Sequence, residues 1–306
     1  MQKELKEGSH QSIDTGEFEQ VAVKVSFVSI VGNLILSLFK FLTGILYSSA
    51  AMVSDAVHSA SDVFSSIIVV IGVRISSKDS DKEHPYGHER FECVAAIILA
   101  TVLCITGLQI GVKAAKNILS GDYKKIVSYS YIPLIMAIVS IVSKEMMFWY
   151  TKMNAKRINS SALMADAWHH RSDALSSVGA LIGIGGALKG YTVLEPVACI
   201  VISVFIIKAA WEIFNDAINR MVDHACSEEM QKQLFECAVS QKGVERVDLL
   251  QTRMFGNKIY VDIEIAVDGN MSLKAAHEIA HNLHDEIEQT FTEVKHVMVH
   301  VNPIDS

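Results

Sequence analysis

Apolar residues gather in six long segments before about residue 214, and shorter polar segments separate them. Each apolar segment is long enough for an α-helix to cross a bilayer core of about 30 Å. The third is the clearest, because no charged residue lies between Val94 and Val112. We therefore predict six transmembrane helices, at about residues 25–47, 50–75, 94–112, 127–150, 160–188 and 192–214.

The pattern changes after about residue 216, where charged residues become frequent and apolar periodicities become short. A helical pattern that opens at Ser227 is followed by two alternating, β-branched segments. These segments meet at Gly256-Asn257, which is typical of a hairpin turn. The expected elements are a helix at 227–241, strands at 244–254 and 258–267, a helix at 272–289 and a strand at 294–301.

Together the two patterns predict an α-helical membrane protein, in which six transmembrane helices precede a cytoplasmic α+β domain. The order α-β-β-α-β favours a small sheet with its helices on one face. We expect a polar N-terminal arm at 1–20, a transmembrane domain at 21–215 and a cytoplasmic domain at 216–306.

Composition narrows the class of protein further. Hydrophobic residues make up 50% of the 306 residues, too many for an ordinary soluble domain. A net charge of −7 argues against a nucleic-acid partner, and the five cysteines form no CxxC pair. Lys and Arg are more frequent in the N-terminal arm and in loops 74–92 and 151–160 than in the opposite loops. The positive-inside rule therefore favours a multi-pass cell-membrane protein with both termini cytoplasmic.

One motif occurs twice, at residues 53–67 and 164–178, and each copy runs into a long apolar segment. Its polar residues recur at i, i+3 and i+7, which is one face of a helix. Ionisable side chains at membrane depth are costly, so their default interpretation is functional. These residues are Asp55, His58 and Asp62 in the first copy and Asp166, His169 and Asp173 in the second.

In each copy the histidine and the second aspartate are at i, i+4 and so face the same way. If the two helices pack together, two imidazoles and two carboxylates converge into a tetrahedral site. Such a site suits Zn²⁺, and also Cd²⁺, Co²⁺ or Fe²⁺, better than Mg²⁺ or Ca²⁺. The predicted ligands are His58, Asp62, His169 and Asp173. Asp55 and Asp166 are expected to be helix-dipole partners or outer-shell carboxylates, with direct ligation as the alternative. His170 is expected to be an outer-shell or packing residue.

Histidine adds a second capability, because its protonation changes near neutral pH. Metal binding needs neutral imidazole and ionised carboxylate, so a site that sheds protons to bind metal can exchange one for the other. We therefore predict proton-coupled transport. A membrane metallohydrolase would use the same four residues, but the sequence offers no general base for it. A metal-sensing membrane subunit that does not transport is the other alternative.

The loop after the second span also contains metal-ligating residue types, in the sequence DKEHPYGH. Asp81, His84 and His88 can bind a second, more exposed metal. Alternatively, Pro85-Tyr86-Gly87 is a simple turn and the histidines are solvated.

HSASD at 58–62, HHRSD at 169–173 and DKEHPYGHERFE at 81–92 together resemble the cation diffusion facilitator family over nearly the whole chain. The resemblance implies a homodimer in the lipid membrane that exports a divalent metal in exchange for protons. It implies the four transport ligands named above, and histidine at both positions resembles exporters of zinc, cadmium or iron. Zn²⁺ is thus the favoured ion, before Fe²⁺, Cd²⁺, Co²⁺ or Mn²⁺.

The resemblance also implies roles outside the transport site. It favours Asp81 and His88 as loop ligands, and Arg90 with Asp223 as a charged interlock between the two domains. It implies a ferredoxin-like or metallochaperone-like C-terminal domain that binds metal and dimerises. We expect His281 and His284 to form a solvated helix face. The C-terminal ligands, implied between protomers, are Asp248, Asp262, His277 and His300; two of them are Asp where other members have His.

Overall fold

The computed structural model describes residues 15–46, 50–121, 131–188 and 193–304. Within these ranges some helical side chains, among them those of Asp55 and His58, lie outside the described part. Contacts divide the chain into two compact units, one of Glu19–Ile218 and one that contains Asn219–Ser306. The division falls three residues after the end of the predicted transmembrane domain.

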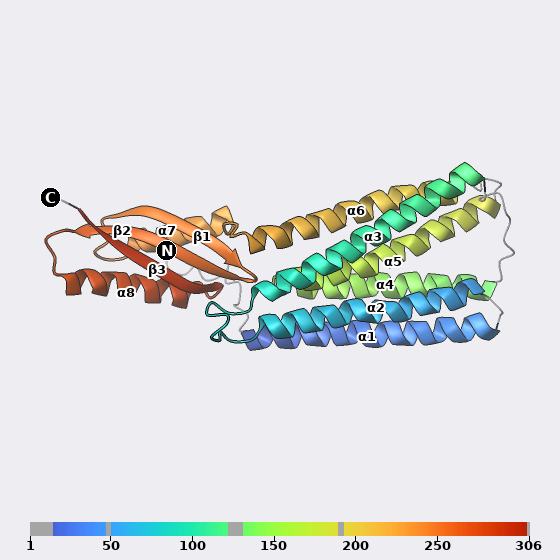
Figure 1. Ribbon diagram of the computed structural model, residues 1–306, viewed down its shortest axis with the longest axis horizontal. Coiled ribbons are helices and arrows are strands. Elements are labelled where there is room, and N and C mark those ends of the chain that lie inside the picture. Colours follow the sequence, from blue (N-terminus) through green and yellow to red (C-terminus); the bar gives the residue numbers. More distant parts are fainter. Residues whose placement is uncertain (1–14, 47–49, 122–130, 189–192, 305–306) are drawn as a thin grey trace, which may run out of the picture. The chain divides into compact units, whose positions relative to one another are not determined.

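The first unit is helical and consists of six long helices in the described ranges (Figure 1). Each overlaps one of the predicted apolar segments. α5 packs against α2, α3 and α4, so it is the central helix of the unit. The helices are α1 (Thr15–Leu46), α2 (Ala50–Ser76), α3 (Arg90–Ser120), α4 (Tyr131–Arg157), α5 (Ser161–Leu188) and α6 (Leu194–Met221).

Four of the helices, α1, α3, α4 and α6, extend well beyond their apolar segments, and α1 and α3 illustrate why. α1 begins at Thr15, inside the segment expected to be a polar arm, and Glu17 lies in its first turn, where a carboxylate favours the helix dipole. α3 runs from Arg90 to Ser120 and ends at Gly121, whose φ of 71° forms a left-handed cap. Apolarity therefore located the helices but not their polar ends.

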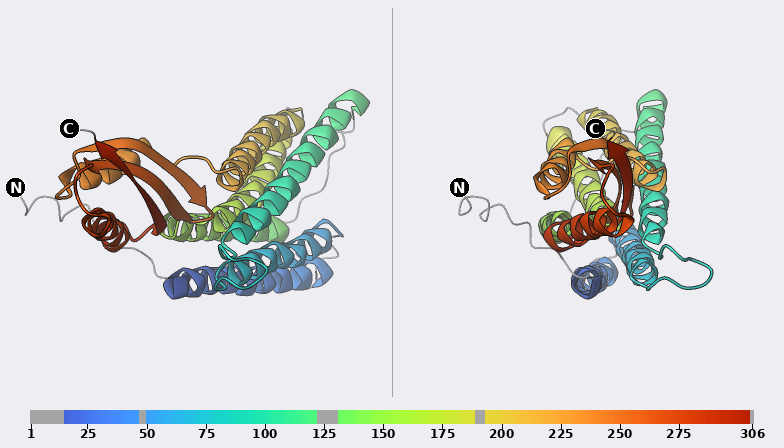
Figure 2. Two further views of the ribbon diagram at one scale, coloured as in Figure 1. Left: turned by 60° about the vertical axis from the view of Figure 1, so that its left-hand side comes forward. Right: turned by 90° about the vertical axis from the view of Figure 1, so that its left-hand side faces the viewer.

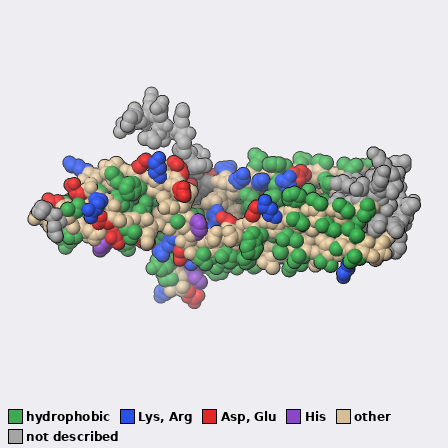
Figure 3. All heavy atoms as spheres, turned by 90° about the horizontal axis from the view of Figure 1, so that it is seen from above, with side chains coloured by type: hydrophobic (Ala, Val, Ile, Leu, Met, Phe, Trp, Pro, Cys, Tyr) green, Lys and Arg blue, Asp and Glu red, His purple; other side chains and the backbone are tan. Residues whose placement is uncertain are grey.

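The surface of the helical unit is apolar over long stretches (Figure 3). On α1, for example, Phe27, Leu38 and Phe39 are more than half exposed. Among the described residues, two helices are long and apolar enough to cross a membrane, over Gly16–Thr43 and Arg90–Ser120. Three of the other predicted spans, α2, α4 and α5, carry buried charged residues such as Asp62, Lys144 and Asp173.

α2 and α3 approach each other very closely at one point. Gly72 of α2 lies against Ala95 of α3, where a Cβ at position 72 would lie 2.4 Å from the Cβ of Ala95. Glycine therefore allows a contact between these helices that any larger residue would push apart. The loop of residues 77–89 joins the same two helices.

The second unit has the predicted element order. Its elements are α7 (Glu228–Ser240), β1 (Arg246–Phe255), β2 (Lys258–Asp268), α8 (Leu273–Thr290) and β3 (Val294–Ile304). Ser227 and Ser272 cap the two helices, because each hydroxyl accepts a hydrogen bond from the backbone N–H three residues later. Figure 2 shows the three strands beside α7 and α8 from two further directions.

The sheet has the order β1-β2-β3. β1 and β2 are antiparallel, and the pairing of Phe255 with Lys258 leaves Gly256 and Asn257 as a two-residue turn. The φ of 63° at Gly256 is the left-handed conformation that this turn requires. The predicted hairpin is therefore confirmed. β3 pairs with β2 in parallel, and α8 forms the crossover between them.

Alternation along β2 decides which face of the sheet is covered. Val261, Ile263 and Ile265 are buried in a core shared with Leu234 of α7 and Leu283 of α8. The residues between them therefore point to the opposite face. The predicted placement of the helices on one face is confirmed.

Candidate metal centres

Asp62 on α2 and both His169 and Asp173 on α5 form what we call the buried group. Their ligand atoms lie within 4.8 Å of one another. The Nε2 of His169 is 3.4 Å from Oδ1 of Asp62. Exposed fractions of 2% for Asp62, 6% for His169 and 8% for Asp173 show that water hardly reaches the group. The i, i+4 spacing on α5 places its two ligands on one face, as the sequence predicted.

His58 is the fourth predicted ligand. It belongs to α2, one helical turn before Asp62, but its side chain lies outside the described residues. The side chain of Asp55 also lies outside the described residues. The structure thus brings together three of the four predicted ligands, and the role of His58 stays a prediction.

Lys144 on α4 was not singled out by the sequence reasoning. Its Nζ lies 2.5 Å from Oδ2 of Asp62 and 2.9 Å from Oδ2 of Asp173. Lys144 is 2% exposed, so this is a buried cation between two buried carboxylates. A charged residue inside the apolar segment at 127–150 is a signal that should have identified it.

Asp166 and His170 form a second polar network beside the buried group. Ser66 donates to Asp166 at 3.3 Å, and His170 Nε2 lies 3.6 Å from Asp166 Oδ2. The same Nε2 lies 3.2 Å from Oγ of Ser29 on α1. Both Asp166 and His170 have an exposed fraction of 0%. Their contacts link α1, α2 and α5, which fits the predicted outer-shell or packing roles.

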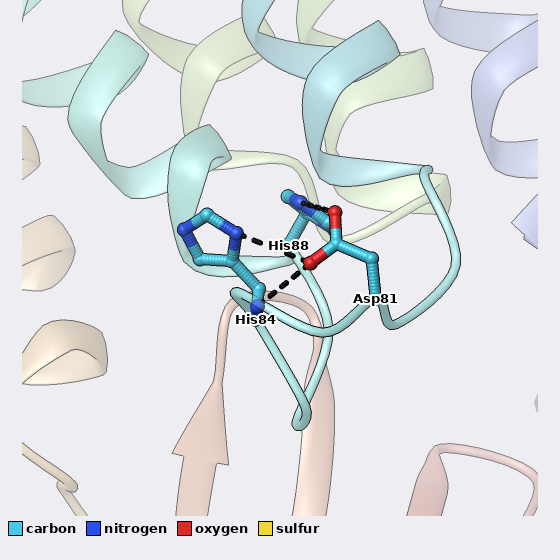
Figure 4. A group of neighbouring side chains, drawn as sticks. All are labelled: Asp81, His84 and His88. Carbon is cyan, nitrogen blue, oxygen red and sulfur yellow. Dashed lines mark hydrogen bonds and ion pairs between the residues drawn. The ribbon is translucent and has the colours of Figure 1, made fainter.

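Asp81, His84 and His88 form a second cluster, the loop group, in the loop that joins α2 and α3. Figure 4 shows the Asp81 carboxylate facing both imidazole rings. Its two oxygens lie 3.6 Å from His84 Nδ1 and 3.4 Å from His88 Nε2. Asp81 and His84 are exposed, whereas His88 is buried. His88 Nδ1 also lies 3.1 Å from the carbonyl oxygen of Asp79, which orients the ring.

The loop backbone holds Asp81 in its charged form. The backbone N–H of His84 donates to Asp81 Oδ1 at 2.7 Å, and that of Glu83 donates at 2.9 Å. The hydrogen bond from His84 is the largest cause that lowers the pKa of Asp81 below its ordinary value. The loop is therefore folded around an ionised carboxylate, which is the protonation state that a metal requires.

The four predicted C-terminal ligands do not converge within one chain. Asp262 lies on β2 and points away from the helix-covered face, because its neighbours Val261 and Ile263 are in the core. His277 is on α8, which covers the other face. His300 on β3 lies opposite Glu264 on β2 in the strand register. Asp248 lies where the register between β1 and β2 shifts. A site that uses all four residues would need a second chain, as the family resemblance implied, and it stays a prediction.

Asp248 has partners of its own at the open face of the sheet. Asn302 donates to Asp248 at 3.0 Å and to Glu264 at 3.2 Å. A hydrogen bond from Arg246 is the largest cause that lowers the pKa of Asp248. Asn302 thus joins two carboxylates from different strands.

His284 departs from the prediction of a solvated helix face. Its Nδ1 lies 2.8 Å from the carbonyl oxygen of Val297 on β3, and its Nε2 lies 3.2 Å from Glu288. The prediction was wrong for His284 because helical spacing alone does not show which strand lies beside the helix. His281 is exposed and pairs with Asp285 at 3.3 Å, as a surface residue would.

The predicted interlock residues lie in different units. Arg90 is the first residue of α3, and Asp223 follows α6 with a φ of 62°. Aspartate tolerates this left-handed conformation better than most residues other than glycine, and Asp223 lies in a turn after the helix. Pairing between Arg90 and Asp223 stays a prediction.

Two family models match the chain. The model described as "Cation efflux transmembrane domain" matches residues 26–222, and "Cation efflux protein, cytoplasmic domain" matches residues 226–304. The chain belongs to the cation efflux family. Members of this family, also called cation diffusion facilitators, are integral membrane transporters of divalent metals and not enzymes. The predicted family and transporter class are thereby confirmed.

Named relatives in this family match most of the chain. The manganese efflux system protein MneP of Bacillus subtilis is 31% identical over 298 residues, which cover 94% of this chain and 98% of MneP. The magnetosome protein MamB of Magnetospira is 31% identical over 272 residues, with coverages of 89% and 92%. Metal tolerance protein C1 of Arabidopsis thaliana is 34% identical over 292 residues, 92% of this chain but only 62% of the plant protein. A solved MamM C-terminal domain covers 25% of this chain at 26% identity, with a TM-score of 0.25.

Proposed function

We propose that this cation efflux protein exports Zn²⁺ from the cytoplasm, by alternating access through a site of His58, Asp62, His169 and Asp173. The observation that carries the proposal is the buried group, in which three ligand atoms from two helices lie within 4.8 Å of one another. Carboxylates buried this deeply need a cation to compensate them. Lys144 supplies one positive charge, and a divalent metal in its place would compensate both carboxylates.

The donor set underlies the choice of Zn²⁺. His169 with Asp62 and Asp173 provides one nitrogen and two oxygens, and His58 would complete a tetrahedral shell. Mn²⁺ is better served by oxygen donors. Fe²⁺, Cd²⁺, Co²⁺ and Mn²⁺ are alternative cargoes of the same mechanism, and the similarity to a protein named for manganese efflux makes Mn²⁺ a necessary comparison.

Proton exchange follows from the same ligands. A metal binds only to neutral imidazole and ionised carboxylate, so protons leave as it binds and return as it is released. The transporter in this proposal is an antiporter that takes up protons while it expels metal. It uses the proton gradient to do so, and no covalent step is needed.

The proposed arrangement in the membrane has all six helices crossing the bilayer and both termini in the cytoplasm. Its support is the apolar surface of the helical unit and the distribution of Lys and Arg between loops. The proposed assembly is a homodimer whose C-terminal domains meet. Asp248, Asp262, His277 and His300 would then bind regulatory metal between protomers, and Arg90 with Asp223 would connect the domains. Asp81 and His88 would bind metal in the loop.

The test is flux into proteoliposomes that contain the full-length protein. Zn²⁺, Cd²⁺, Fe²⁺, Co²⁺ and Mn²⁺ are compared with and without an imposed pH gradient. We expect Zn²⁺ to move fastest, and an acidic vesicle lumen to accelerate its uptake, because protons leave the lumen as the metal enters. Asp173→Ala should abolish flux, because it removes one ligand of a buried dication, whereas Glu212→Gln on the exposed face of α6 should not. Flux that is insensitive to the gradient would refute antiport, and faster Mn²⁺ than Zn²⁺ would refute the zinc assignment.

A further inference from the structure

Lys144 is as deeply buried as the carboxylates that it contacts. Its Nζ lies 2.5 Å from Asp62 and 2.9 Å from Asp173, and its exposed fraction is 2%. The distance to Asp173 is that of a charge-assisted hydrogen bond, and Asp62 lies closer still. The Lys144 ammonium on α4 thus contacts Asp62 on α2 and Asp173 on α5, so a single side chain connects three helices.

The next residue on α4 shows that this arrangement is selective. Glu145 has other partners: it is 3.6 Å from Arg171 of α5 and accepts a hydrogen bond from Trp149 at 3.0 Å. Lys144 is therefore not paired with its own neighbour. Among the described residues, the ion-pair partners of Lys144 are Asp62 and Asp173, both members of the buried group.

We propose that Lys144 is a tethered cation that competes with the transported metal for Asp62 and Asp173, and so weakens metal binding and speeds metal release. This inference rests on the proposed transport site. Lys144 is a positioning residue for the cargo and not a ligand. Arriving metal displaces the ammonium, and the returning ammonium helps to expel the metal.

Charge counting supports the competition. Two ionised carboxylates carry −2, which a lysine reduces to −1 and a dication reduces to zero. A dication and the ammonium together would leave +1 in a site that water hardly reaches, which is costly. The four-carbon stem of lysine is flexible, so the ammonium can withdraw while its backbone stays in α4. One occupant at a time is therefore the favourable state.

If Lys144 has a purely structural role, its removal should change the metal affinity in the opposite direction. If Lys144 only held the helices together, removing it would loosen Asp62 and Asp173 and weaken the metal site. If it competes, removing its charge leaves two uncompensated carboxylates, which bind a dication more tightly. The sign of the change in metal affinity therefore separates the two roles.

The experiment compares the full-length wild type with Lys144→Met, Lys144→Gln and Lys144→Arg. Zn²⁺ affinity is measured by calorimetry in detergent, after subtraction of the isotherm of Asp173→Asn, which retains the other metal sites. Flux into proteoliposomes gives KM and the maximal rate. Lys208→Met is the matched control, since Lys208 is exposed on α6 and pairs with Glu212.

We expect Kd and KM to fall at least about tenfold in Lys144→Met and Lys144→Gln, equivalent to about 1.4 kcal/mol, and the maximal rate to fall with them. Lys144→Arg should stay near wild type because it keeps the charge. Lys144→Gln keeps a hydrogen-bond donor, so it remains informative if the methionine variant fails to fold. Unchanged or weaker Zn²⁺ binding in the folded neutral variants overturns the competition alone. Unchanged flux in Asp173→Asn overturns the transport site and the competition with it.

Discussion

The buried group and the loop group each bring a set of three metal-ligating side chains within 4.8 Å, but in opposite surroundings. In the loop, backbone N–H groups and water compensate the Asp81 carboxylate. In the helical unit, Asp62 and Asp173 are out of reach of water, and the charge of Lys144 compensates them. Similar ligands are thus balanced by dipoles at one place and by a full charge at the other.

This difference teaches what each group is suited to do. A carboxylate balanced by backbone dipoles keeps those partners when a metal arrives, so metal adds to an existing structure. A carboxylate balanced by a mobile cation must lose it, so metal replaces a partner. The loop group is suited to hold an ion, and the buried group to exchange one.

Asp62→Asn should give the largest effect, because Asp62 contacts both His169 and Lys144. We expect Zn²⁺ flux to fall at least about 100-fold, and the free energy of unfolding to fall by about 3–5 kcal/mol, the cost of breaking a buried ion pair. Flux assays and denaturant unfolding measure the two effects. Zn²⁺ flux near that of wild type would show that the buried group is not the site of metal exchange, which is the role that distinguishes it from the loop group.

Gly72→Val tests the helix contact between the two groups. The valine side chain would collide with Ala95 of α3, so we expect the free energy of unfolding to fall by about 1–3 kcal/mol. The control is Ile71→Val, since Ile71 is 52% exposed. Thermal unfolding in detergent measures both variants, and equal melting temperatures would show that α2 and α3 are not tightly packed there.

His88→Ala should affect the loop group and spare the transport cycle. The variant loses the contacts with Asp81 and with the carbonyl of Asp79. We expect metal affinity at the loop to fall about tenfold, as for the loss of one ligand or its orienting partner. The maximal rate of flux should change less than about threefold. A loss of flux as large as that of Asp62→Asn would mean that the two groups work as one site.

The smallest expected effect is the pH dependence of Asp81. Backbone hydrogen bonds, first that from His84, lower its pKa below the ordinary 3.8. The stabilisation that this shift gives is complete above pH 3.8 and is lost as the pH falls through the lowered value. The Asp81 carboxylate should thus stay ionised between pH 5 and 8. Carboxyl ¹³C NMR of the full-length protein labelled at aspartate measures the value, and a pKa above 3.8 would contradict the loop geometry.

Much of the fold followed from the sequence because its signals are local. Six apolar segments located six helices, Gly256 identified the hairpin, and Ser227 and Ser272 identified helix starts. The ends of α1 and α3 did not follow, because helices continue into polar sequence where hydropathy falls. Local patterns also could not show that β3 pairs in parallel beside β2, which depends on the crossover of α8.

The sequence predicted those residues of the candidate site that belong to the repeated motif. Asp62, His169 and Asp173 were found because their motif occurs twice. Lys144 belongs to no repeated motif, and only the packing of α4 against α5 reveals its partners. Similarly, His284 looked like a surface residue until β3 was placed beside α8. A pattern in the sequence cannot identify contact partners that lie on another helix or strand outside that pattern.

The close contact at Gly72 has a mechanical consequence. α2 is one unbroken helix from Ala50 to Ser76, and Asp62 lies about 21 Å from the end at which the loop begins. Because Gly72 packs α2 closely against α3, we expect the two helices to move together. Asp62 lies near the middle of α2, and the loop group follows its end. In the proposed alternating-access cycle, a rotation of α2 that turns Asp62 toward one side of the membrane would therefore also move Asp81.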